Sequence, residues 1–150
     1  MRVPPPTVLV VDDDADSRTI HKHMLQSLGY DALCAADAES AFYAVARLGS
    51  RLRFAVVDLM MPKIDGAQLV RAVRHGSPVQ RLPIVVASAV YPDDSTIVRG
   101  VEKEGCVFLR KPFKVADLRD AILVAKQTAR LMEEPVVWTV GRLEPVQGAM

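Results

Sequence analysis

Five short apolar segments alternate with five segments of helical spacing, and this alternation constrains the fold more than any other feature. The apolar segments are residues 7–11, 30–35, 54–57, 83–88 and 106–109, and helices are expected at about 16–28, 37–48, 67–75, 91–105 and 115–133. Strands that alternate with helices across short connections predict a parallel sheet with right-handed crossovers and helices on both faces. Five such units in 150 residues favour a doubly wound α/β fold, strand order 2-1-3-4-5, over a closed eight-stranded barrel.

Local sequence patterns predict which faces of these strands and helices are buried and where two of the helices begin. Residues 7–11 are apolar throughout, as expected for a strand covered on both faces, whereas residues 30–35 are less apolar and belong nearer an edge. Asp16 or Ser17 is expected to cap the first helix, and Asp37 the second. The predicted apolar face of the first helix contains Ile20, Met24, Leu25 and Leu28, and that of the last helix contains Val115, Leu118, Ile122, Ala125, Ala129 and Met132.

Length and charge restrict the class of protein. We expect one domain at residues 7–133, an extended lead-in at 1–6 and a tail or linker at 134–150. The formal net charge of +1 provides no general basic field for nucleic acid. Cys34 and Cys106 lack metal-ligand spacing, and we expect both to be buried thiols in a reducing cytoplasm. The absence of a membrane-length apolar run or a signal peptide predicts a cytoplasmic protein without a membrane partner.

Acidic side chains follow two of the predicted strands. Asp12 and Asp13 follow the first strand, and Asp58 follows the third. In the predicted strand order the winding reverses between these two strands, so their carboxyl ends should meet at one crevice. Three close carboxylates repel one another, and either protonation of one or a bound hard cation such as Mg²⁺ relieves the repulsion. Asp13 and Asp58 are therefore candidate metal ligands, whereas Asp14 is alternatively a helix cap only.

Two more strand ends carry groups suited to phosphate. Lys111 follows the fifth strand, where its ammonium can pair with Asp58 or neutralise a transferred phosphoryl group. Ser88 ends the fourth strand and offers a hydroxyl to a phosphate oxygen. Taken singly, the lysine fits a solvated surface and the serine fits a turn or a cap. Their common position at the ends of parallel strands favours one joint site.

Together these residues resemble the receiver domain of two-component response regulators. The resemblance rests on four motifs in the expected order and spacing, namely Val10-Val11-Asp12-Asp13, Asp58 followed by Met61-Pro62 and Asp65-Gly66, Ser88-Ala89, and Lys111-Pro112-Phe113. It covers about residues 7–127. It implies a CheY-like (flavodoxin-like) three-layer sandwich and a phosphorylation switch that is not a turnover enzyme.

The resemblance also implies a role for each site residue. Asp58 would accept a phosphoryl group from a sensor histidine kinase or a phosphotransfer protein, and Ser88 and Lys111 would hold the phosphoryl oxygens. Mg²⁺ would be bound by Asp13, Asp58 and the backbone carbonyl of Met60, with Asp12 in support. Phosphorylation adds negative charge and strong hydrogen-bond acceptors, which can shift the protein between two packings.

The expected output is a change in protein–protein contacts. Ser88 and Phe108 would form the switch, although Phe108 is alternatively a static core residue. A downstream partner would bind the face built from helix 91–105, strand 106–109 and helix 115–133. The segment around Trp138 is a candidate for a partner or homodimer contact, or else a frayed extension. No helix-turn-helix follows residue 133 and the tail is not basic, so no direct nucleic-acid contact is expected.

Two positions that would flank the phosphoryl group depart from the usual polar pattern. Met60 and Val90 are apolar at these positions, so we expect poor orientation of hydrolytic water and a long-lived phosphorylated state.

Two other functions remain open. One alternative is a Mg²⁺-dependent phosphatase with an aspartyl nucleophile, although Met60 occupies the position of the second acid that such enzymes typically need. The other alternative is a non-phosphorylated interaction module with the same fold.

Overall fold

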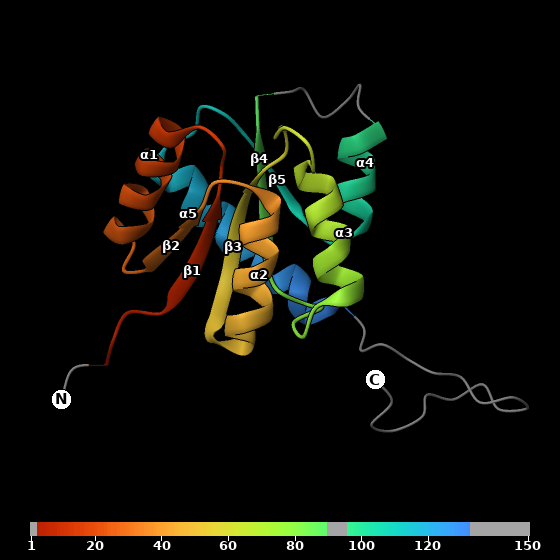
Figure 1. Cartoon of the computed structure of the whole chain (residues 1–150). Helices are drawn as coiled ribbons and strands as arrows, with labels where there is room; N and C mark the ends of the chain where they lie inside the picture. The colour runs from red at the N-terminus through yellow and green to blue at the C-terminus, as the bar shows by residue number, and fades with distance from the viewer. Residues whose placement is uncertain (1–2, 90–95, 133–150) are drawn as a thin grey trace, which may run out of the picture.

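The computed structural model describes residues 3–89 and 96–132, and in this part of the chain five strands alternate with five α-helices. In chain order the elements are β1 (Thr7–Val11), α1 (Ala15–Ser27), β2 (Asp31–Ala35), α2 (Ala38–Leu48), a 3₁₀ turn (Gly49–Arg51), β3 (Leu52–Asp58), α3 (Gly66–Gly76), β4 (Ile84–Ser88), α4 (Thr96–Lys103), β5 (Val107–Arg110) and α5 (Val115–Leu131) (Figure 1). The predicted order of strands and helices is confirmed, with shifts of a few residues at the ends of some elements.

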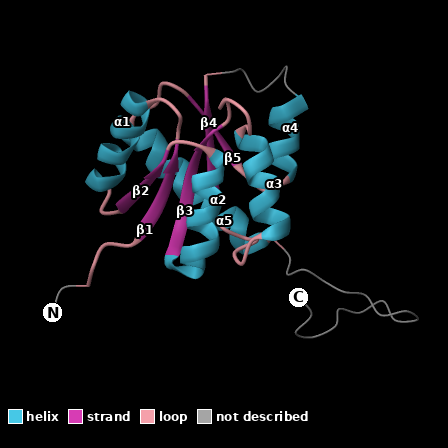
Figure 2. Cartoon of the chain, in the orientation of Figure 1, coloured by secondary structure: helices cyan, strands magenta, loops and turns pink. Residues whose placement is uncertain are grey.

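The sheet has the predicted topology. Its strands are parallel and lie in the order β2-β1-β3-β4-β5 (Figure 2). Val11 at the end of β1 lies opposite Val57, and Asp58 at the end of β3 lies opposite Ala87. We call the edge at which the strands end the carboxyl edge, and the edge at which they begin the amino edge. The doubly wound fold is therefore confirmed.

Helices cover both faces of the sheet and create two hydrophobic cores. Helices α1 and α5 lie on one face, and α2, α3 and α4 lie on the other (Figure 1). Because side chains alternate along a strand, Val8 and Val10 of β1 pack in the core beneath α1 and α5, whereas Leu9 and Val11 pack in the opposite core. The central strands are buried on both faces, as their continuous apolar sequences predict.

Side-chain caps determine where several helices begin. Asp37 caps α2 as predicted, and its carboxylate accepts a hydrogen bond from the amide of Ser40. For α1 the assignment of the cap to Asp16 or Ser17 was wrong, whereas the alternative that Asp14 is a helix cap is confirmed. Asp14 has extended backbone angles and accepts from the amide of Asp16, so its carboxylate satisfies one of the free N–H groups of the first turn.

Burial differs from the prediction most clearly at Cys34, Ile20 and Val115. Cys34 is exposed because it lies on the edge strand β2, of which only Ala32 and Ala35 are buried. Ile20 is 53% exposed, since α1 turns His21 and Leu25 inward instead. Val115, at the start of α5, is 36% exposed, and Met132 at the other end of the predicted face is partly buried, whereas the predicted residues from Leu118 to Ala129 are buried. Cys106 is buried as expected, just before β5.

Some predictions fall outside the described residues. These are the start of the fourth helix at residues 91–95, the side chain of Val90, and the tail that contains Trp138. Within the described residues, every helix is too short or too polar to cross a membrane. The domain bounds of 7–133 remain a prediction.

Candidate functional site

Three aspartates meet at the carboxyl edge of the sheet. Asp12 and Asp13 directly follow β1, and Asp58 ends the neighbouring β3. Carboxylate oxygens of the three side chains lie within 4.8 Å of one another. The structure thus brings together residues that the strand order predicted to converge, at the point where the winding of the sheet reverses.

Asp12 is the most deeply buried member of this group, at 1% exposure. It accepts hydrogen bonds from Lys111 Nζ (2.8 Å), from Ser17 Oγ (2.7 Å) and from the amide of Asp14 (2.9 Å). Burial raises the pKa of Asp12, but the bonds from Lys111, Ser17 and Asp14 together outweigh burial and lower the pKa below its ordinary value. Asp12 is therefore an anion whose charge the surrounding donors already stabilise.

Asp58 is also buried, at 8% exposure, but its charge is less well stabilised. It accepts a 3.3 Å hydrogen bond from the amide of Met60, and Lys111 Nζ lies 3.6 Å from its Oδ1. Burial raises its pKa to about 6, with Lys111 opposing the shift and Asp12 adding to it. Asp58 is thus the carboxylate at this edge that gains most from an additional positive charge.

Lys111 connects the aspartates to β4. Its amide donates to the carbonyl of Ser88 (2.8 Å), so the chain leaving β5 lies beside the end of β4. The Lys111–Pro112 peptide bond is cis. The ammonium lies nearer Asp12 (2.8 Å) than Asp58 (3.6 Å), whereas the sequence suggested Asp58 as its partner. The ammonium of Lys111 therefore bridges the carboxylates of Asp12 and Asp58.

Helix α1 contributes three site residues that the sequence analysis missed. Ser17 donates to Asp12 and accepts a 3.2 Å hydrogen bond from Lys111 Nζ. Arg18 Nη1 donates to the backbone carbonyl of Asp12 (2.7 Å). The spacing of residues 17, 18 and 21 on one helix that follows the acidic pair was the available signal, since such residues share a face.

His21 is the third residue of this group. It is 7% exposed, stacks on Phe113 with ring centroids 4.7 Å apart, and has Nδ1 3.9 Å from Asp12 Oδ2. Burial lowers the pKa of His21, and Lys111 lowers it further. A neutral imidazole therefore forms part of the wall behind Asp12.

The loop after β3 closes tightly over Asp58 because residue 66 is a glycine. The amide of Gly66 donates to the carbonyl of Leu59 (3.0 Å), and a Cβ at this position would lie 2.3 Å from the backbone oxygen of Asp58. A larger residue would have to displace the backbone that carries the aspartate. Asp65 then caps α3 through a reciprocal capping box with Gln68.

The remaining predicted residues lie around this centre. Ser88 is fully buried and lies one residue beyond Ala87, which is the partner of Asp58 in the sheet. Met60 is 59% exposed at the open side of the edge. Phe108 is partly buried and packs against the core beneath α2, α3 and α4. These positions leave the predicted roles of Ser88, Met60 and Phe108 as proposals.

The donor set fits a hard divalent cation. Its members are carboxylate oxygens, which Mg²⁺ prefers, and exposed Asp13 leaves the edge open to water ligands. The raised pKa of Asp58 also indicates a negative charge that a cation would stabilise. Asp12, by contrast, already has an ammonium and a hydroxyl as partners.

Comparison with known proteins supports a single family. The family model of the response regulator receiver domain matches residues 8–123. The chain is 36% identical over 115 residues to a probable transcriptional regulator, ycf27, of Porphyridium aerugineum, which covers 77% of this chain and 45% of that protein. It is 35% identical over 124 residues to the DNA-binding response regulator MtrA of Mycobacterium tuberculosis, covering 83% of this chain and 50% of MtrA.

Solved structures agree with the sequence comparisons. A response regulator receiver protein of Pseudomonas putida matches 81% of this chain and 98% of its own, with a TM-score of 0.71 and 32% identity. The chemotaxis protein CheY4 of Vibrio cholerae matches 79% of this chain and 97% of its own, with a TM-score of 0.70 and 28% identity. The chain spans about half the length of the curated relatives it matches. Because MtrA is named a DNA-binding protein, these relatives do not support the expectation that nucleic acid is excluded.

Proposed function

Because the chain belongs to the response regulator receiver domain family, we propose that it is a phosphoacceptor switch with Asp58 as the phosphorylated residue. One observation carries this proposal: Asp58 is a buried carboxylate that lies beside both Lys111 and two further aspartates at the carboxyl edge. The phosphoryl donor would be a histidine of a sensor kinase or of a phosphotransfer protein.

The residues around Asp58 suit phosphoryl transfer. A carboxylate oxygen of Asp58 attacks the phosphorus, the P–N bond to the donor histidine breaks, and its electron pair returns to the imidazole. The ammonium of Lys111, 3.6 Å from Asp58, neutralises charge that develops on the phosphoryl oxygens. Since Lys111 also bonds to Asp12 and Ser17, it is held near the place where that charge appears.

The acidic residues would hold Mg²⁺ in the phosphorylation-competent protein. The ligands would be Asp13, Asp58 and the backbone carbonyl of Met60, with Asp12 in support. The ion supplies positive charge to the equatorial phosphoryl oxygens when it is bound. Asp12 contributes mainly by orienting Lys111, because its Oδ2 accepts from both Lys111 and Ser17.

Phosphorylation would be read out through β4 and β5. The hydroxyl of Ser88 would bond to a phosphoryl oxygen, and Phe108 on the neighbouring strand would repack in response. The phosphoryl group then favours one of two packings through its different contacts in each. The α4–β5–α5 face is the proposed surface for a downstream protein or for a second copy of this chain.

A turnover enzyme is the less favoured function. A phosphatase with an aspartyl nucleophile typically carries an acid two residues later, where this chain has Met60 with its side chain in solvent. The relatives named above are regulators. We therefore propose slow self-dephosphorylation in place of catalytic turnover, and a cytoplasmic location as for other partners of sensor kinases.

Acetyl phosphate with Mg²⁺ tests the proposal. Mass spectrometry of the intact protein should show one added phosphoryl group in the native chain and none in Asp58→Asn. Asp31→Asn is a matched control, because Asp31 is an exposed aspartate at the amino edge. An adduct that persists in Asp58→Asn, or no adduct in any variant, would contradict the proposal, and continuous release of phosphate would favour the phosphatase.

A further inference from the structure

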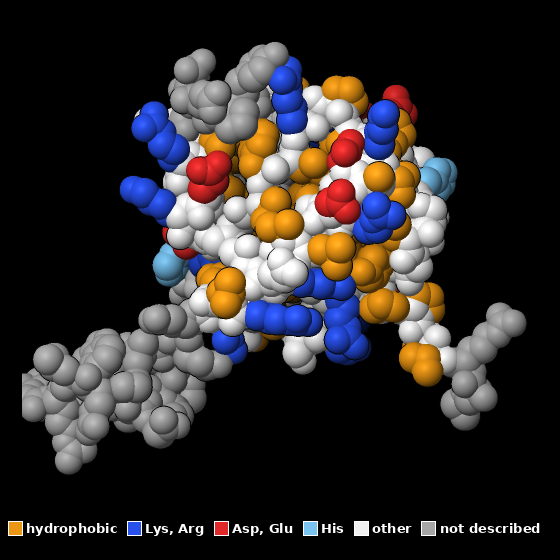
Figure 3. Space-filling view, turned by 180° about the vertical axis from the view of Figure 1, so that it is seen from behind, with side chains coloured by type: hydrophobic (Ala, Val, Ile, Leu, Met, Phe, Trp, Pro, Cys, Tyr) orange, Lys and Arg blue, Asp and Glu red, His pale blue; other side chains and the backbone are white. Residues whose placement is uncertain are grey.

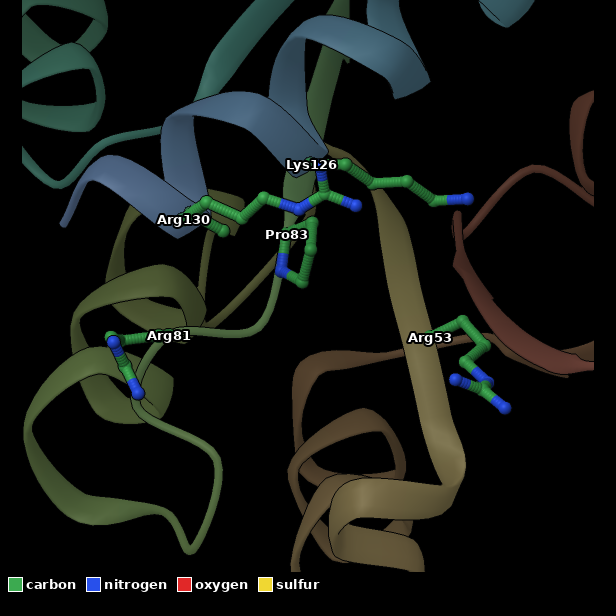
Figure 4. A pocket seen from close by; sticks show the side chains of 6 residues that line it. Arg53, Arg81, Pro83, Lys126 and Arg130 are labelled. Carbon is green, nitrogen blue, oxygen red and sulfur yellow. The ribbon is translucent and has the colours of Figure 1, made fainter.

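A second charged site lies at the amino edge, at the other end of the sheet from Asp58. A cavity of about 440 Å³ is lined by Arg53, Arg81, Pro83, Lys126, Ala129 and Arg130 (Figure 4). Arg53 is the second residue of β3, whereas Asp58 is the last. Arg81 precedes β4, and Lys126 and Arg130 lie on α5. Three segments far apart in the sequence therefore supply its charges.

This cavity has a single sign of charge. Four of its lining residues are basic and none is acidic among the described residues. Within residues 3–89 and 96–132, Arg53 and Arg130 make no ion pair with a carboxylate. In the view of the molecule from behind, several Lys and Arg side chains lie along the lower edge, where no acidic side chain is visible, and others are scattered higher up among the acidic ones (Figure 3). Since the whole chain carries only +1, this is a local concentration of positive charge.

Neighbouring groups hold part of the site in place. Lys126 Nζ donates to Tyr30 Oη (3.0 Å) and lies 5.3 Å and 5.6 Å from the ring centroids of Tyr30 and Phe54. Cation–π and hydrogen-bond contacts of this kind restrict a lysine that would otherwise sample many rotamers. Pro83 and Ala129 add apolar surface to the lining. The cavity therefore combines one restrained ammonium, that of Lys126, with exposed arginines and a small apolar wall.

The arrangement of the cations indicates the shape of a ligand. Arg130 extends past Pro83 in the direction of Lys126, and Arg53 and Arg81 lie apart on either side (Figure 4). Cations spread around a cavity match an anion whose charge is distributed over more than one group. Guanidinium groups favour phosphate oxygens because two N–H donors can bind in parallel. The volume falls within the range of sites for small molecules, whereas nucleic acid is usually bound by extended stripes of charge.

We propose that this cavity binds a small diphosphate-bearing anion of the nucleoside diphosphate class. The guanidinium groups of Arg53 and Arg130 and the ammonium of Lys126 bind phosphate oxygens, and Pro83 and Ala129 contact the apolar part of the ligand. This binding goes beyond the proposed phosphorylation function and does not depend on it, because none of the lining residues takes part in the site around Asp58.

Calorimetric titration without divalent cations tests the proposal. Inorganic pyrophosphate and adenosine diphosphate are titrated separately into the full chain at constant salt. We expect saturable binding of one ligand per chain with Kd below about 1 mM. The double variant Arg53→Gln, Arg130→Gln should weaken binding roughly tenfold or more. Tighter binding of the nucleotide than of pyrophosphate indicates that the organic part is recognised, and equal binding indicates recognition of the diphosphate alone.

Matched variants separate a site from a general field. Arg119→Gln removes an exposed arginine from α5 that does not line the cavity and should leave the affinity unchanged. Arg130→Lys keeps the charge, loses the bidentate geometry, and should give an intermediate affinity. Circular dichroism verifies the folding of each variant. The arginine variants should still form the acetyl phosphate adduct, so a failure here is distinguishable from a failure of the proposed function.

Four results would overturn the inference. The first two are a heat of binding that does not saturate, and a loss of affinity in Arg119→Gln equal to that in the double arginine variant. The third is tighter binding of a single-stranded oligonucleotide than of either diphosphate. The fourth is binding that appears only in the double variant Glu133→Gln, Glu134→Gln. The last variant is included because these two carboxylates directly follow residue 132 in the sequence. If it alone binds diphosphate, the native chain does not bind this ligand class.

Discussion

The two edges of the sheet hold charge in opposite ways. At the carboxyl edge Asp12, Asp58 and Lys111 have mixed signs, are largely buried and lie in mutual contact. At the amino edge Arg53 and Arg130 are exposed, have one sign and lack carboxylate partners among the described residues. A buried network depends on each member for stability, whereas separate solvated charges contribute mainly to the electrostatic field. Equivalent substitutions should therefore change the free energy of unfolding by different amounts at the two edges.

Removal of one lysine at each edge gives the largest expected contrast. Lys111→Met leaves the carboxylate of Asp12 buried without its ammonium, and we expect the free energy of unfolding to fall by about 3 kcal/mol. Lys126→Met loses a hydrogen bond and cation–π contacts in a half-buried position, for which we expect about 1 kcal/mol. Urea unfolding followed by circular dichroism measures both. Equal losses would contradict the distinction between the edges.

The raised pKa of Asp58 predicts that its removal stabilises the protein in the absence of divalent cations. The folded state holds this proton with a pKa of about 6, against an ordinary value of 3.8, so ionised Asp58 destabilises the fold at neutral pH. We expect Asp58→Asn to raise the free energy of unfolding by about 2 kcal/mol at about pH 7.5. As the pH falls through 6 the native protein takes up the proton, and the difference should vanish near about pH 4.

Comparison with Asp31→Asn makes this measurement specific. Asp31 is an exposed aspartate at the amino edge, and its substitution should change the stability little at any pH. Chemical unfolding of the native chain and both variants across the pH range supplies the comparison. A constant difference between Asp58→Asn and the native protein would show that burial does not destabilise the charge of Asp58. Mg²⁺ should reduce or reverse the difference, since the variant lacks one proposed ligand.

A smaller effect is expected when one donor is removed from the carboxyl edge. Ser17→Ala deletes the hydroxyl that donates to buried Asp12, and we expect a loss of about 1 kcal/mol. Ser27→Ala is a control on the same helix, because Ser27 donates to the carbonyl of Met24 in an exposed position and should contribute little. Thermal unfolding of the native chain and the two variants measures both losses of stability. A larger loss in Ser27→Ala would contradict the importance of the buried network.

The smallest expected effect concerns the lifetime of the proposed phosphorylated state. Met60 is exposed beside Asp58, and an amide at this position can orient a water molecule that the thioether cannot. We expect Met60→Asn to accelerate loss of the phosphoryl group roughly threefold, a change of less than about 1 kcal/mol in the barrier. Decay of the labelled protein is compared with that of Ile64→Asn, a substitution in the same loop. Equal or slower decay in Met60→Asn would contradict the hypothesis.

The fold was accessible from the sequence because its signals are local. The apolar strand segments and the helix cap at Asp37 each depend on a few neighbouring residues. Their order along the chain then restricts the sheet topology, because parallel strands require crossovers. The convergence of Asp12, Asp13 and Asp58 follows from that topology, since each residue lies at a strand end.

The predictions of side-chain burial failed where contacts between elements distant in the sequence determine which residues are buried. Ile20 was predicted to lie on the apolar face of α1 because of its helical spacing, but it is exposed, and the neighbouring His21 is buried against Phe113 instead. Cys34 was predicted to be buried in a strand, but β2 has a neighbour on one side only. A local pattern carries no information about such contacts.

By itself, the sequence determined the order of the strands, the two faces of the sheet and the presence of carboxylates at one edge, because periodicity and strand ends are properties of neighbouring residues. The tertiary structure alone decided that Lys111 lies closer to Asp12 than to Asp58, and that Arg53, Arg81, Lys126 and Arg130 surround one cavity. These groups are brought together from distant parts of the chain by the packing of α5 and the loops against the sheet. Their energies depend on distance and burial, which exist only once the chain has folded.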